Sequence, residues 1–134
     1  MLPIVFYAHS GIRYLVLLAA IAAVLYLLYG IATRQPFDKP ATILSAAYVG
    51  LLDLQVLTGV LLYLLIPSYP ALLGHVVMML AAVTLAHVAS IMNKRREDKS
   101  RGLAIAGVAG SLVLVVGGIM AIGRPLFGSS GLLG

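Results

Sequence analysis

Four long apolar stretches constrain this chain more than any other feature of its sequence. They cover residues 4–33, 41–66, 71–93 and 102–123. A helix that spans a bilayer needs about 20 mostly apolar residues, and each stretch is long enough. Of the 134 residues, 62% are hydrophobic and only 10% are charged, whereas a soluble domain carries about 25% charged residues. We therefore predict an all-α integral membrane four-helix bundle that forms a single transmembrane domain over residues 1–134.

The breaks between the four stretches predict an up-down-up-down order. Residues 34–40 contain two prolines, and proline stops a helix because it lacks a backbone donor. Residues 67–70 form a short break with a proline at each end, so the second and third spans should be antiparallel neighbours. Residues 93–101 form a charged run that cannot enter hydrocarbon cheaply. Residues 124–134, rich in glycine and serine, are expected to form a loose tail.

The basic residues predict the orientation of the bundle. Seven of the nine fall in the first and third breaks: Arg34, Lys39, Lys94, Arg95, Arg96, Lys99 and Arg101. These two breaks share one side of any four-span topology, and basic loops face the cytoplasm. We therefore expect both termini on the outer side. The run at residues 94–101 is interpreted as a topology anchor, with attraction to anionic lipid headgroups as an alternative.

Several classes of function are excluded or disfavoured by what the chain lacks. It has no cysteine, so disulfides, thiolate metal sites and dithiol redox chemistry are excluded. The sequence offers no nucleophile–base arrangement, no paired carboxylates and no phosphate-binding loop. An electron carrier or a subunit is favoured over a stand-alone enzyme. The net charge of +5 lies in membrane loops, so it indicates no nucleic-acid partner.

Two histidines within the spans are the leading candidates for a cofactor site. At about 1.5 Å per residue, His9 and His75 each lie about 6–8 Å below the outer end of a helix. The first and third helices of such a bundle lie diagonally across its core. Two imidazoles at equal depth on these helices could bind the iron of a b-type haem from opposite sides. Histidines near a membrane interface are also commonly headgroup-level residues with no ligand role, and that alternative stays open.

Arg13 lies one turn below His9 on the same helix face, which gives it two possible partners. Beside a haem, its guanidinium could bind a propionate in a bidentate fork. The alternative is a structural ion pair with Asp53 on the second helix, about 6–9 Å deeper in the membrane.

His87 follows His75 by twelve residues, which places it about 18 Å further along the helix and about 120° around it. This spacing argues against a simple two-haem ladder, and we expect His87 to face elsewhere, toward the glycines of the fourth helix. A structural or proton-handling role is favoured over cofactor binding. A quinone partner near His87 or Asp53 is a further possibility that no motif specifies.

The segment His9-Ser10-Gly11-Ile12-Arg13-Tyr14 resembles the opening of the first helix in a family of small bacterial four-helix membrane proteins labelled cytochrome-b-like. The resemblance continues through residues 55–63 and 75–81, and the fourth helix is generic. It implies a haem, a bacterial inner membrane location and functional roles for His9 and His75. The chain departs from the family pattern at Leu52, where a further histidine can stand, and at Gly74, which replaces an acidic residue.

The sequence hypothesis is thus a haem b electron-transfer protein with His9 and His75 as iron ligands and Arg13 and His87 as further cofactor-binding candidates. Its expected partners are the lipid bilayer and other membrane subunits or further copies of the chain. Two alternatives stay open. One is a cofactor-free accessory subunit of a larger membrane complex. The other is a small proton or solute transporter that uses Asp53, Arg13 and His87.

Overall fold

The computed structural model describes residues 2–66 and 70–121 and contains four α-helices within them. Helix α1 spans Leu2–Ala32, α2 spans Lys39–Leu65, α3 spans Pro70–Lys94 and α4 spans Arg101–Ala121. These bounds lie within about two residues of the predicted ones, so the prediction of an all-helical chain with four long helices is confirmed. The expected tail at residues 124–134 lies outside the described residues.

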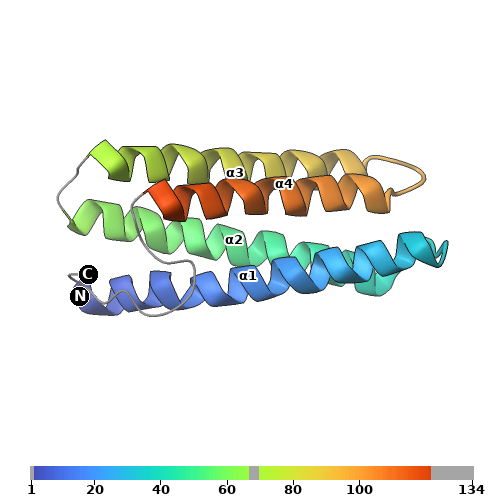
Figure 1. The fold of residues 1–134 in the computed structure, drawn as a ribbon, viewed down its shortest axis with the longest axis horizontal. Helices are drawn as coiled ribbons and strands as arrows, with labels where there is room; N and C mark the ends of the chain where they lie inside the picture. The colour runs from blue at the N-terminus through green and yellow to red at the C-terminus, as the bar shows by residue number, and fades with distance from the viewer. Residues whose placement is uncertain (1, 67–69, 122–134) are drawn as a thin grey trace.

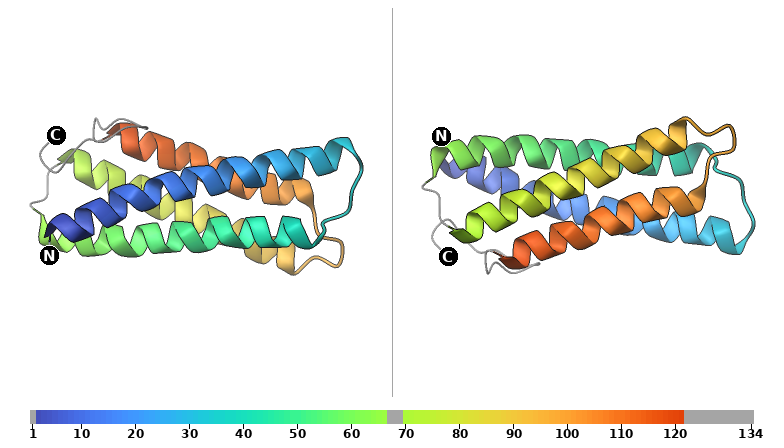
Figure 2. Two further views of the ribbon diagram at one scale, coloured as in Figure 1. Left: turned by 90° about the horizontal axis from the view of Figure 1, so that it is seen from below. Right: turned by 90° about the horizontal axis from the view of Figure 1, so that it is seen from above.

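The four helices run antiparallel in chain order along one long axis (Figure 1). Helix α1 packs against α2 and α4, and α3 packs most closely against α4. Helices α2 and α3 contact each other much less, and seen from above they cross at an angle (Figure 2). Helices α1 and α3 lie diagonally across the interior, as predicted, and make no close backbone contacts with each other.

All four helices are long and apolar enough to cross a membrane. Large apolar side chains cover the outside of the bundle, including Leu18, Leu25, Leu64, Val77 and Val113, each at least 60% exposed. A soluble protein rarely exposes so much contiguous apolar surface. The interior includes several small residues, with Ala20, Ala23 and Ala82 completely buried, which lets the helices approach closely there.

The connection from α1 to α2 is closed by two capping arrangements. Arg34 adopts a left-handed conformation (φ 56°), and the amide of Gln35 donates to the carbonyl of Gly30, as in a Schellman motif. Asp38 then caps α2, because its side chain accepts a hydrogen bond from the amide of Ala41 at 3.1 Å. The hydroxyl of Tyr26 also donates to Asp38, at 2.5 Å.

Asp38 should make stability depend on pH. Its hydrogen bond from Tyr26, with smaller contributions from the Ala41 amide and Arg101, holds the pKa of the carboxyl below its usual value. Asp38 therefore stabilises the fold above its unfolded pKa of about 3.9, and this contribution is lost as the pH falls through the lowered folded pKa. Asp38→Asn keeps the cap but not the charge. Thermal unfolding in detergent should show wild type more stable than this variant at pH 7, with the gap closing below pH 4; a gap independent of pH would contradict this role.

Arg101, at the start of α4, is a buried anchor and not an exposed loop charge. Only 5% of its side chain is exposed. Its guanidinium donates to the carbonyls of Gln35, Pro36 and Tyr26 at 2.8–3.2 Å and lies 3.3 Å from Asp38. The guanidinium packs directly against Gly30. A side chain at this position would not fit, because an added Cβ would overlap the guanidinium. Arg101 therefore joins the α1–α2 connection to the fourth helix.

A buried hydrogen bond joins α2 and α4 near the middle of the bundle. The hydroxyl groups of Tyr48 and Ser111 lie 2.6 Å apart, and both residues are fully buried. Interhelical hydrogen bonds of this kind contribute on average about 0.6 kcal/mol in membrane proteins.

We expect Tyr48→Phe to lower the free energy of unfolding by about 0.6–1.7 kcal/mol, because it removes this bond and little volume. A double-mutant cycle with Ser111→Ala, measured by unfolding in mixed micelles, isolates the pair. A coupling energy near zero would show that the two hydroxyl groups act independently.

Candidate functional site

His9 is held on α1 by polar groups of α2. Its Nδ1 lies 3.0 Å from the backbone oxygen of Gln55 and 3.1 Å from the hydroxyl of Thr58. A carbonyl oxygen can only accept, so Nδ1 carries the ring proton and the Nε2 of the neutral imidazole carries the lone pair. Gly59 makes room for the ring, since a Cβ there would lie 3.0 Å from Cε1 of His9.

His75 is held on α3 in the same way by α4. Its Nδ1 lies 2.8 Å from the backbone oxygen of Gly118. This carbonyl again fixes the proton on Nδ1 and leaves the lone pair on Nε2. Gly118 is small because α3 passes close to it: a Cβ there would lie 3.2 Å from the Cβ of Met78. Both histidines therefore have the same tautomer, fixed by the backbone of a neighbouring helix.

The two imidazole rings lie next to each other in the interior, edge to face. Their centroids are 6.4 Å apart and their planes are nearly perpendicular, at 88°. The sequence predicted that these histidines lie at one level on diagonal helices, and the structure brings them together. Each ring is held by a backbone carbonyl of another helix.

A cavity of about 250 Å³ adjoins the two histidines. All four helices contribute to its wall, which is mostly apolar, and the seam between α2 and α3 supplies more than half of the lining residues. The polar lining side chains are His9, Ser10, Arg13, Gln55, Tyr63 and His75. The side-chain oxygen Oε1 of Gln55 is buried and has no hydrogen-bond partner within the described protein. Such a group usually has a partner, so the cavity offers a polar position for a ligand.

Arg13 is buried beside the cavity, with 7% of its surface exposed. Its guanidinium donates to the hydroxyl of Tyr14 at 2.9 Å and lies 4.7 Å from the centre of the same ring. The alternative hypothesis of an Arg13–Asp53 ion pair is wrong, because Asp53 bonds to His87. Arg13 thus belongs to the histidine cavity, as its position one turn below His9 predicted.

His87 pairs with Asp53 on the neighbouring helix and does not face the glycines of α4, so that expectation was wrong. Its Nε2 lies 2.6 Å from Oδ1 of Asp53. Both side chains are almost half exposed, at 44% and 47%, on the apolar outside of the bundle. The pair does not line the histidine cavity. The structure therefore separates two polar groups: the His9–His75 cavity with Arg13, and the His87–Asp53 pair.

The groups that fix the histidines could not be found from residue types alone. The carbonyls of Gln55 and Gly118 belong to the backbone, which carries no residue-specific signal. Thr58 is the exception, because a hydroxyl side chain in an apolar span indicates a possible hydrogen-bond partner for a neighbouring polar group. Within the described residues, no three histidine, cysteine or acidic side chains gather to form a metal site by themselves.

The fold and the site define a class: a four-helix chain with membrane-length apolar helices and two histidines next to each other in its interior. Comparisons with known protein families, with curated proteins and with solved structures find no match. The resemblance of the first helix to cytochrome-b-like proteins thus stays a prediction, and the site must be interpreted from its own geometry.

Proposed function

We propose that this protein is a membrane-embedded electron carrier that binds one b-type haem between His9 and His75. The observation that carries the proposal is the adjacent pair of imidazoles, each with its Nδ1 held by a backbone carbonyl of another helix.

The spacing of the two rings supports ligation of a single metal ion. An imidazole nitrogen binds a first-row metal at about 2.0–2.1 Å, and the ring centre lies about 1.1 Å behind that nitrogen, so two imidazoles on opposite sides of one metal have centres about 6.3 Å apart. The observed separation is 6.4 Å. Haem iron receives four ligands from the porphyrin, so two histidines complete its coordination without a third protein ligand.

The fixed tautomers support the same conclusion. A histidine that binds a metal usually donates its other ring N–H to a carbonyl or carboxylate, which orients the ring and raises the basicity of the ligating nitrogen. His9 and His75 both donate through Nδ1, which leaves Nε2 as the ligating nitrogen. Here the same arrangement occurs twice around one cavity.

The cavity suits a large, mostly apolar ligand with an acidic edge. Its 250 Å³ exceed the cavity of about 150 Å³ that accepts benzene in another protein. A wider ring can extend between α2 and α3, which contact each other little. Arg13 supplies a buried positive charge that would pair with a propionate. When bound, the haem would supply a one-electron iron couple; the protein fixes the ligand nitrogens and excludes water with its apolar wall.

We further propose that this site lies near the outer side of a bacterial inner membrane, because basic loops face the cytoplasm. Arg34, Lys39 and the run at residues 94–99 are exposed at the end of the bundle opposite to His9 and His75. The proposed partners are the lipid bilayer and other membrane subunits or further copies of the chain, with a quinone as an additional electron donor or acceptor.

The test of the proposed function is a reduced-minus-oxidised absorption spectrum of protein purified from cells supplied with haem. We expect the sharp bands of a six-coordinate b-type haem. A flat spectrum from folded, helical protein would reject the haem and leave the cofactor-free accessory subunit as the better account.

The His87–Asp53 pair favours a second candidate function, proton handling. Ionisable groups in a span are costly, about 2.5–3.5 kcal/mol each at the centre on insertion scales, and usually mark a functional site. Here Nε2 of His87 lies 2.6 Å from Oδ1 of Asp53, on the outside of the bundle. If the protein is a transporter, Asp53→Asn should abolish proton flux into liposomes. The haem proposal expects no such flux in the wild type, and the same haem spectrum in the variant.

A further inference from the structure

A second, smaller cavity lies at the opposite end of the seam between α2 and α3. Its volume is about 80 Å³, enough for a group of a few heavy atoms. The first turns of α2, the last turns of α3 and the start of α4 form its wall. It shares no lining residue with the histidine cavity, so it is a separate site.

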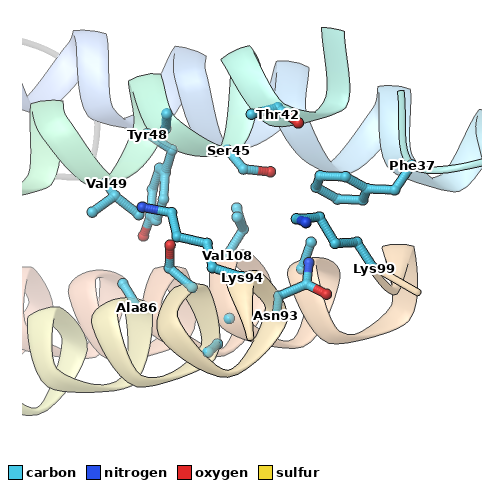
Figure 3. A pocket seen from close by; sticks show the side chains of 15 residues that line it. Phe37, Thr42, Ser45, Tyr48, Val49, Ala86, Asn93, Lys94, Lys99 and Val108 are labelled. Carbon is cyan, nitrogen blue, oxygen red and sulfur yellow. The ribbon is translucent and has the colours of Figure 1, made fainter. Parts of the chain in front are cut away.

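Two ammonium groups face this cavity. Lys94 ends α3 and Lys99 lies in the following connection, and both line the cavity (Figure 3). Figure 3 shows their side chains reaching toward α2, with the hydroxyl of Ser45 pointing into the space between them. The Oγ of Ser45 is buried and has no hydrogen-bond partner within the described protein. Two exposed lysines and a buried hydroxyl group thus line one small cavity.

Among the residues that the structure describes, no carboxylate forms an ion pair with these two lysines. The chain has only four acidic residues. Asp38 pairs with Arg101 and Asp53 pairs with His87, and no carboxylate lies within 4 Å of Lys94 or Lys99 among the described ion pairs. Glu97 and Asp98 are exposed in the connection and do not line the cavity. The positive charge therefore remains available for an anion from outside the protein.

The rest of the wall indicates the source of that anion. Below the lysines the lining is apolar, with Val49, Ala86 and Val108. The lysines lie at the end of membrane-length helices, which is the level of lipid headgroups. Basic pockets between helices at this level bind anionic headgroups. A phospholipid is complementary to both parts of the wall. Its phosphate can bind the ammonium groups, and its acyl chains can pack against the apolar surface.

We propose that this cavity binds the phosphodiester headgroup of an anionic phospholipid. Lys94 and Lys99 bind the phosphate oxygens, and the Ser45 hydroxyl donates a further hydrogen bond. The site is independent of the haem proposal, because it shares no residue with it.

The test is native mass spectrometry of protein reconstituted with phosphatidylcholine and phosphatidylglycerol and then returned to detergent. The wild type should retain phosphatidylglycerol. The double variant Lys94→Gln/Lys99→Gln should retain at most about one tenth as much of this lipid as the wild type. The matched control, Arg95→Gln/Arg96→Gln, loses the same charge from the same connection but outside the cavity, and should retain the lipid. Ser45→Val partly fills the cavity without changing any charge, and should also lose it.

Three outcomes would overturn the proposal. Equal loss in the lysine and arginine variants would show diffuse attraction to the surface and no defined site. Full retention by Ser45→Val would show that the lipid does not enter the cavity. Thermal stabilisation by inorganic phosphate equal to that by phosphatidylglycerol would identify a soluble anion as the ligand. All four proteins should unfold at similar temperatures in phosphatidylcholine alone, which checks that the variants are folded.

Discussion

His9→Ala and His75→Ala should each weaken haem binding by more than about 100-fold, because each removes one of the two proposed iron ligands. Loss of a group that only orients a ligand already costs about 10–100-fold, so loss of the ligand itself should cost more. The measurement is the haem-to-protein ratio after purification, from the absorption spectrum and the protein concentration. We expect neither single variant to keep the six-coordinate b-type spectrum.

His87→Ala is the matched control for these variants. It removes the third histidine of the chain, which bonds Asp53 and does not line the histidine cavity. Its haem content should equal that of the wild type. If His87→Ala loses the haem while His9→Ala keeps it, the proposed ligands are wrong and the site must include the His87–Asp53 pair.

The second large effect is expected at Arg101. Arg101→Ala should lower the free energy of unfolding by about 3 kcal/mol, because it removes a buried partner of Asp38 and leaves several carbonyls without their donor. The guanidinium bonds the carbonyls of Gln35, Pro36 and Tyr26 as well as the carboxylate. Unfolding of purified protein in mixed micelles measures the loss directly.

Arg95→Ala is the control, since it removes an exposed arginine from the same end of the bundle and should change stability by no more than about 0.5 kcal/mol. Arg101→Lys should fall between the two, because one ammonium group cannot reach all the acceptors that the planar guanidinium reaches. If Arg101→Ala unfolds like the wild type, the anchoring role of Arg101 is wrong.

The sequence predicted the helices well, because their causes are local. Long apolar stretches and the breaking residues between them set the bounds of α1 to α4 within about two residues. The role of Arg101 could not be predicted in the same way. As part of a basic run it looked like another topology charge, yet it is buried because the α1–α2 connection folds back over it. Only the tertiary structure brings those carbonyls to the guanidinium.

In the candidate site, too, the features that depend on position along a helix could be predicted, and those that depend on tertiary packing could not. Equal depth on diagonal helices predicted that His9 and His75 lie close together, since depth follows from counting residues along a helix. Rotation about the helix axis is harder to predict, and here the expectation for His87 failed: it lies against Asp53 on α2 and not against α4. The carbonyls of Gln55 and Gly118, which fix the tautomers, depend on how closely neighbouring helices pack.

The most direct test of the central proposal is the low-temperature EPR spectrum of the ferric protein after titration with haem. The account predicts one haem per chain and a low-spin signal, because two imidazole nitrogens from His9 and His75 give iron a strong axial field. A high-spin signal, or haem that fails to bind to folded protein, would contradict ligation by this pair.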